Sequence, residues 1–242
     1  MKPLVAFALA CTALVAPASV SSGSPLTVYA AASLTEVLPR IDNGPRYNFA
    51  GSDQLAIQIQ QGAPADVFAA ASPKQPELLY RSGLVRKPVV FATNKLIILV
   101  PRSNPGGISN VYDLRRTGLK IVIGDRTVPI GAYTRQILDT LGITAEVMKN
   151  VVSQETDVKG IVTKVALGEA DAGFVYATDA KPVASQTRTL TLPQWAQPPI
   201  RYEVAVVKST ASPAAAQAFL KKLRSKRGRG LLAKAGFGLP KR

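Results

Sequence analysis

Two serines, each placed after a short strand, are the residues of this chain best suited to bind an anion. Ser33 follows the apolar run 26–32, which has the composition of a buried parallel strand. Glu36 comes three residues later, the spacing of a capping box at a helix start. The first amides of a helix lack an internal partner, so together with a serine hydroxyl they can receive an anion. The alternative is that Ser33 is a structural cap only.

Ser52 repeats this arrangement further along the chain. It follows a short strand predicted over 47–50 and precedes a helix predicted over 54–61. Its hydroxyl is therefore also expected at a strand-to-helix junction, where serine is a favoured cap. An ordinary capping role is again the alternative. Neither serine has the Ser-x-x-Lys spacing and the chain contains no histidine, so a serine hydrolase would lack its general base.

The composition limits the class of protein. The 242 residues are 47% hydrophobic, which suits one large or two small domains with a sizeable core. The formal net charge is +15, and a basic balance of this kind can indicate a nucleic-acid partner. Most basic residues are scattered singly, however, and we interpret the one dense cluster, 221–229, as a solvated helix face. Because there is no histidine, histidine-based metal sites are excluded.

The first residues have the features of an export signal. Lys2 supplies a positive charge, 4–15 is an uncharged apolar run too short to span a membrane, and Ala16 and Ala18 form a small-x-small cleavage pattern. We predict a signal peptide over 1–18, with cleavage between Ala18 and about residue 25. The mature chain is then periplasmic or extracytoplasmic. Lipoprotein anchoring at Cys11 is the less favoured alternative, because the residues before it fit a lipobox poorly.

Strands alternate with helices along the rest of the chain, which predicts an α/β fold with mostly parallel sheets. A break near 95–105 and a return near 200 indicate two lobes, lobe 1 from 26–96 plus 203–242 and lobe 2 from 97–202. Ligands of such folds bind at the carboxyl ends of strands, where two hinged lobes would form a cleft. Strands are predicted over 26–32, 47–50, 67–71, 93–100, 120–124, 147–152, 173–176, 189–192 and 200–207.

Short motifs carry a resemblance to a known family. In order, they are VYAAASL at 28–34, FAGS at 49–52, GAPAD at 62–66, GD and VPIG at 124–131, DV at 157–158 and GFVYATDA at 173–180. Together they resemble the periplasmic molybdate-binding proteins of ABC importers, the ModA family. The resemblance runs from about residue 26 to the C-terminus. It implies a type II, two-lobed periplasmic binding protein that traps molybdate or tungstate.

The resemblance also implies which residues bind the oxyanion. Ser33 and Ser52 would each give a hydroxyl and an amide, Ile130 and Val158 would give backbone amides, and Tyr176 would give its phenol. The only metal would be molybdenum, within the oxyanion that these residues hold. For Tyr176, the alternative is a core residue with a satisfied hydroxyl.

The chain departs from the family pattern at a few positions in these motifs. Gly51 and Asp53 stand where relatives often have serine, and Ile130 stands where they usually have alanine. A carboxylate close to a dianion would repel it, so we expect the side chain of Asp53 to point away from the site. Ile130 would tighten the pocket wall or shift the preferred anion size.

The chemistry of the ligand agrees with neutral donors. Molybdate is a divalent tetrahedral oxyanion with acceptor oxygens only, so converging N–H and O–H groups can hold it. Protonated phosphate would set a donor against a donor, whereas sulfate can be rejected only by size. We therefore expect a monomeric binding protein, not an enzyme, that needs no cofactor and serves an ABC membrane permease. The alternatives are a receptor for another oxyanion, such as sulfate or tungstate, and a basic nucleic-acid-binding protein.

Overall fold

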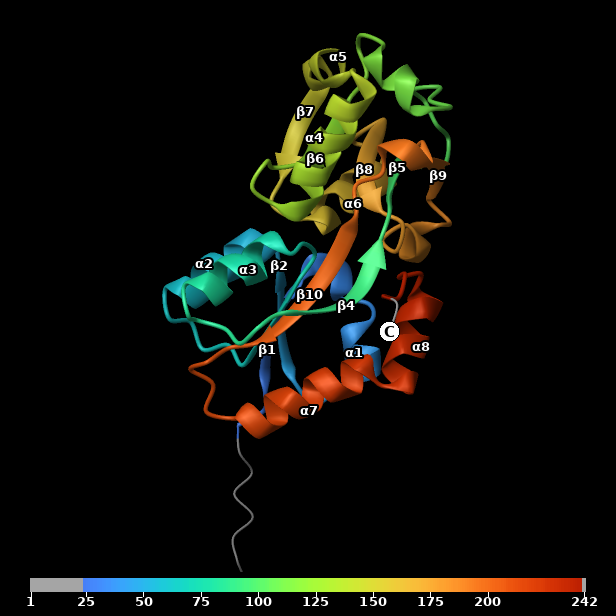
Figure 1. Cartoon of the computed structure of the whole chain (residues 1–242). Helices are drawn as coiled ribbons and strands as arrows, with labels where there is room; N and C mark the ends of the chain where they lie inside the picture. Colours follow the sequence, from blue (N-terminus) through green and yellow to red (C-terminus); the bar gives the residue numbers. More distant parts are fainter. Residues whose placement is uncertain (1–23, 241–242) are drawn as a thin grey trace, which may run out of the picture.

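The computed structural model describes residues 24–240. The predicted signal peptide and Cys11 lie outside the described residues. Two bodies, each built on its own sheet, lie one above the other in Figure 1, joined by chain segments that run between them. Strands β4 and β10 lie side by side at this junction, as their antiparallel pairing requires.

The first sheet has five strands in the order β2-β1-β3-β10-β4. β1 pairs in parallel with β2 and with β3, whereas β10 runs antiparallel to β3 and to β4. The carboxyl ends of β1 and β2 therefore meet at one edge of the sheet, at Ala31 and Ala50. The strands are β1 (Thr27–Ala31), β2 (Arg46–Ala50), β3 (Val67–Ala70), β4 (Val89–Asn94) and β10 (Ile200–Val206).

The second sheet also has five strands, in the order β7-β6-β8-β5-β9. β6 pairs in parallel with β7 and β8, and β5 runs antiparallel to β8 and β9. Both sheets are thus mixed, since each adds antiparallel strands to a parallel core. The strands are β5 (Leu96–Pro101), β6 (Ile121–Gly124), β7 (Val151–Glu155), β8 (Ala172–Tyr176) and β9 (Thr187–Thr191).

Helices pack on these sheets. In the first body α2 (Ser52–Gln60) and α3 (Lys74–Arg81) contact β3, while α7 (Pro213–Arg224) contacts β10. In the second body α4 (Pro129–Leu141) and α6 (Val158–Ala166) contact β6 and β8. The other helices are α1 (Leu38–Ile41), α5 (Thr144–Lys149) and α8 (Lys226–Ala235), with short 3-10 helices at Ala32–Leu34, Val111–Arg115, Lys181–Val183 and Gln194–Ala196.

The chain passes from the first sheet to the second at Lys95, between β4 and β5, and returns between β9 and β10. A single strand predicted over 93–100 is therefore wrong, because Val89–Asn94 and Leu96–Pro101 belong to different sheets. These crossings lie within a few residues of the predicted lobe boundaries. The assignment of the segments to two lobes, used below, is our proposal.

A second correction concerns the strand predicted over 147–152. Residues 147–149 end helix α5, and the strand begins only at Val151. Ile143 and Val147 are both buried and lie four residues apart, and the Val147 amide donates to the Ile143 carbonyl. Helical spacing is therefore what places both side chains in the core.

Candidate functional site

Ser33 lies just beyond the carboxyl end of β1, in the 3-10 turn Ala32–Leu34. The predicted capping box is wrong, because this turn has no side-chain cap, and the Glu36 carboxylate instead lies 3.8 Å from Lys159 Nζ. The Ser33 hydroxyl is 2.9 Å from the hydroxyl of Tyr202 on β10. The serine is thus positioned by a tertiary contact and not by a local helix cap.

Ser52 lies at the same edge of the first sheet, after β2. The helix cap is Gly51, so Ser52 is the first residue of α2 and not its capping residue. Its Oγ accepts a hydrogen bond of 3.1 Å from the amide of Ala71, which follows β3. The predicted strand-to-helix junction is confirmed, but the hydroxyl binds a neighbouring strand end instead of its own helix.

Two helix starts of the second lobe face the first lobe. Pro129 occupies the first position of α4 and has no N–H, so the amide of Ile130 is the first that this helix offers. Val158 is the first residue of α6, and Asp157 caps the helix by accepting from the amides of Lys159 and Gly160. This cap leaves the Val158 amide without an intrahelical acceptor.

Tyr176 ends β8, at the carboxyl edge of the second sheet. The side chain is 1% exposed, and its hydroxyl has no hydrogen-bond partner among the described residues. Burial raises the pKa of this phenol well above its ordinary value, so the group remains a donor at neutral pH. The alternative of a core tyrosine with a satisfied hydroxyl does not hold here.

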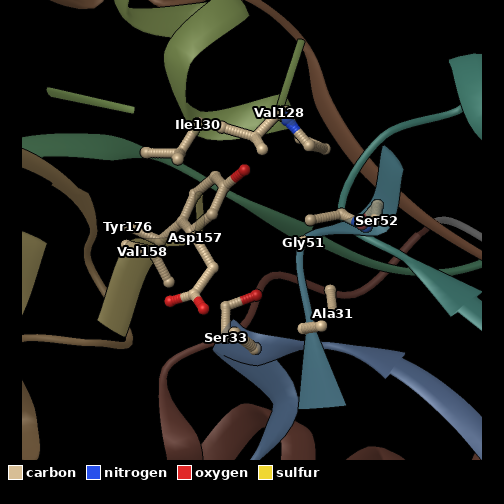
Figure 2. Close-up of a pocket in the computed structure, with 13 residues that line it drawn as sticks. Ala31, Ser33, Gly51, Ser52, Val128, Ile130, Asp157, Val158 and Tyr176 are labelled. Carbon is tan, nitrogen blue, oxygen red and sulfur yellow. The ribbon is translucent and has the colours of Figure 1, made fainter. Parts of the chain in front are cut away.

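One small cavity brings all five predicted binding residues together. In Figure 2 the Tyr176 hydroxyl points into a space bordered by Ser33, Ser52 and Val128. The cavity volume is about 20 Å³, which suits a compact ion and not a sugar or peptide. The full lining is Ala31, Ala32, Ser33, Ala50, Gly51, Ser52, Ala71, Val128, Pro129, Ile130, Asp157, Val158 and Tyr176.

The contacts of both serine hydroxyls leave them able to donate into this cavity. Because the Ala71 amide donates to Ser52 Oγ, the Ser52 hydrogen is left to point elsewhere. Asn94 Nδ2 lies 3.4 Å from the Tyr202 oxygen and donates to it, so the Tyr202 hydrogen can be given to Ser33. Burial raises the pKa of Tyr202, which keeps that hydrogen in place. With Tyr202 as the donor to Ser33, each serine can offer its O–H to a ligand made only of acceptors.

Asp53 stands apart from the cavity, as predicted. It is absent from the lining, and its Oδ2 accepts a hydrogen bond of 2.7 Å from Thr127 Oγ1 on the loop before α4. Its other oxygen, Oδ1, is buried without a partner among the described residues. The carboxylate thus bridges the two lobes beside the cavity.

Sequence reasoning missed the residues that support the site. Asp157 lines the cavity as well as capping α6, whereas the Asp-Val motif predicts a binding role for Val158 alone. Tyr202 supports Ser33 from 169 positions away, so no local pattern could reveal it. Asp179 is 1% exposed and lies 3.4 Å from Lys159 Nζ, and desolvation raises its pKa to about 6. The signal available for Asp179 was its place in the GFVYATDA motif.

The fold and the cavity together define the class of two-lobed solute-binding proteins. A family model described as "Bacterial extracellular solute-binding protein" matches residues 26–238. The chain belongs to the bacterial extracellular solute-binding protein family. Within residues 24–240, every helix is too short or too polar to span a membrane, and no group of acidic side chains is placed to hold a metal ion.

Individual relatives show which members of that family the chain resembles. A molybdate-binding protein ModA from Mycobacterium tuberculosis (strain ATCC 25618 / H37Rv) is 38% identical, over 93% of this chain and 88% of the relative. The ModA protein of Haemophilus influenzae is 32% identical, over 90% and 92%. The solved Azotobacter vinelandii periplasmic molybdate-binding protein matches with a TM-score of 0.81 and 25% identity, over 89% of this chain and 100% of that chain. These matches confirm the predicted fold class and the family resemblance.

Proposed function

We propose that this chain is an extracytoplasmic receptor that captures molybdate, and also tungstate, for an ABC importer. Ser33, Ser52 and Tyr176 donate through hydroxyls, and Ser33, Ser52, Ile130 and Val158 through backbone amides. The similarity to proteins named molybdate-binding, from several bacteria, supports this assignment.

The observation that carries the proposal is the unpartnered hydroxyl of Tyr176. A buried donor without an acceptor costs about 1–3 kcal/mol, so native proteins rarely leave one unpaired. Here the donor points into a cavity lined by two serines whose hydroxyls can also donate to a ligand. A ligand that brings several acceptor oxygens into that space satisfies all of them together.

The cavity also explains how a dianion can be held without a cationic side chain in the lining. Hydrogen bonds to a charged acceptor contribute about 1.5–3 kcal/mol each, and the start of a helix adds a favourable dipole. Desolvating the ion costs several kcal/mol and offsets much of that sum. The balance leaves the anion tightly bound but releasable, as delivery to a permease requires.

The wider role follows from the family. The proposed partners are the molybdate ion and the membrane permease of the importer, and the protein acts as a monomer without a nucleic-acid partner. Binding and release require no catalysed reaction, so we propose no enzymatic activity and no cofactor. Export by the signal peptide predicted over 1–18 would deliver the chain to the compartment where such receptors work.

Calorimetric titration with molybdate, tungstate, sulfate and phosphate tests the proposal. We expect one site per chain for molybdate and tungstate, with weaker binding of sulfate and none of hydrogen phosphate. Sulfate has the same charge and acceptors but shorter bonds, so it is the matched control for size. If sulfate bound more tightly than molybdate, the ligand would be reassigned. If none of the four anions bound, the receptor proposal would be rejected.

A further inference from the structure

One carboxylate beside the cavity has no role in the anion contacts proposed above. Asp53 directly follows Ser52 at the start of α2, where a charge turned toward the ligand would repel a dianion. It turns instead to the second lobe, where its Oδ2 accepts from Thr127 Oγ1 at 2.7 Å. Neither Asp53 nor Thr127 lines the cavity.

Thr127 has a second acceptor available within its own loop. Asp125 Oδ1 lies 2.9 Å from the Thr127 amide and 3.0 Å from its hydroxyl. A hydroxyl has one hydrogen, and the shorter of its two contacts is the one to Asp53. When the lobes part, the hydroxyl can return to Asp125 while the amide bond keeps the loop in place. The contact across the cleft therefore depends on how closely the lobes approach.

The lobes do approach closely at this point. A Cβ placed on Gly51 would lie 2.5 Å from the carbonyl oxygen of Thr156 and 2.8 Å from Asp53 Oδ1. The absence of a side chain at Gly51 thus lets the second lobe come near enough for Thr127 to reach Asp53.

We propose that the Asp53–Thr127 hydrogen bond is a latch that forms when the lobes close and that slows release of the anion. The inference rests on the proposed function, since closure follows binding. Both partners are positioning residues, because they act on the lobes and do not touch the ligand. The latch should therefore change the dissociation rate and leave the association rate unchanged.

A second contact across the cleft provides an internal comparison. Lys159 Nζ lies 3.8 Å from Glu36 Oε1, and these side chains are 30% and 49% exposed. Lys159 is also nearer to Asp179, at 3.4 Å within its own lobe. An exposed pair of this length contributes little. Glu36→Gln is therefore the matched control, a change at the same cleft that should barely alter release.

The test measures release of radiolabelled molybdate during a chase with unlabelled molybdate. Thr127→Val removes the hydroxyl and keeps shape and charge, so we expect release to become about three- to tenfold faster. Thr127→Ser should restore the wild-type rate. Asp53→Ala combined with Thr127→Val should be no faster than the faster single variant, because both remove one bond. Unchanged melting temperatures without ligand would show that the fold is intact.

Two results would overturn the latch. One is a wild-type release rate in Thr127→Val. The other is tighter binding in both Asp53→Ala and Asp53→Asn, which would show that the carboxylate acts mainly by repulsion. Normal molybdate binding combined with either result would reject the latch alone, whereas a wild-type chain that bound none of the four oxyanions would reject the proposed function itself.

Discussion

The two lobes supply donors to the cavity in different ways. On the side of the first lobe, Ser33 and Ser52 already accept or share hydrogen bonds with Tyr202 and Ala71. On the side of the second lobe, the Tyr176 hydroxyl has no hydrogen-bond partner in the described part of the chain and lies beside amides at the starts of two helices. We call the donors from the first lobe the first half of the site and those from the second lobe the second half. The first half is oriented before a ligand arrives, whereas the donors of the second half lack acceptors until one does.

This difference indicates how binding and closure are coupled. An anion that first meets the oriented serines presents its remaining oxygens to the second lobe. The unsatisfied donors there gain their partners only when the lobes approach, so they provide the differential affinity that a ligand needs to shift the open–closed equilibrium. Substitutions in the two halves should then differ in what they do to the ligand-free protein.

The largest effect is expected where the two halves meet. Gly51→Ala would place a Cβ 2.5 Å from the Thr156 carbonyl oxygen, and a backbone atom cannot move aside easily. The φ of Gly51 is −59°, so alanine fits the backbone itself. The Asp53 carboxylate, 2.8 Å away in the same lobe, can rotate aside, so the clash that cannot be relieved is the one with the Thr156 backbone on closure. We expect molybdate affinity to fall by about 3 kcal/mol with an unchanged melting temperature.

Small-angle scattering checks this expectation directly. The wild-type chain should become more compact with saturating molybdate, and Gly51→Ala should not. Full compaction of the variant would show that the lobes do not approach at Gly51 in the way the structure indicates.

The serines of the first half should show the next largest effect. Ser52→Ala removes a donor to the anion and also leaves the Ala71 amide without its acceptor. We expect about 2 kcal/mol weaker binding together with a lower melting temperature of the ligand-free chain. Ser33→Ala should act similarly through Tyr202. Calorimetry and thermal denaturation measure the two effects separately, and unchanged affinity in both variants would remove the serines from the site.

Tyr176→Phe should show the difference between the two halves of the site most clearly. It removes a donor that has no partner within residues 24–240, so binding should weaken by about 1.5 kcal/mol while the unliganded protein keeps or gains stability. The same two measurements apply. A loss of ligand-free stability as large as that of Ser52→Ala would mean that the hydroxyl already has a partner, and the contrast between the halves would fail.

The sequence was most informative where the signals are local. The apolar runs before Ser33 and Ser52 predict strand ends, and the helix starts at Ile130 and Val158 follow from proline and aspartate in their usual places. Because parallel strands share a carboxyl edge, such ends could be expected to lie together. The proposed binding roles of Ile130, Val158 and Tyr176 rest on the family resemblance and not on their own sequence pattern.

What the sequence could not show depends on distant contacts. The local pattern around Ser33 predicts a capping box, but the Ser33 hydroxyl instead contacts Tyr202 on a distant strand. The apolar chain on either side of Lys95 looks continuous, although it divides between two sheets. Charge repulsion predicts that the Asp53 side chain points away from the site, but its partner, Thr127, depends on how the lobes come together.

The smallest expected effect concerns the pH dependence of stability, and it arises from Asp179, a buried carboxylate outside the cavity lining. The first half is supported by the neutral groups Tyr202 and Asn94. On the side of the second lobe, in contrast, the Asp179 carboxylate lies 3.4 Å from Lys159 Nζ. Desolvation raises the pKa of Asp179 to about 6 from its ordinary 3.8, so between these values the folded chain binds more protons than the unfolded one. This contribution to stability is therefore present below about pH 4, declines as pH rises, and is lost above about pH 6.

Asp179→Asn isolates this contribution. The variant cannot titrate at this position, so its stability relative to wild type should be higher at pH 7 than at pH 5, by about 1 kcal/mol. Denaturant unfolding of both chains at the two pH values measures the difference. Other acidic groups titrate alike in the two chains and cancel. A difference that did not change with pH would mean that Asp179 stays ionised with Lys159 throughout, and the second half would then be as insensitive to pH as the first.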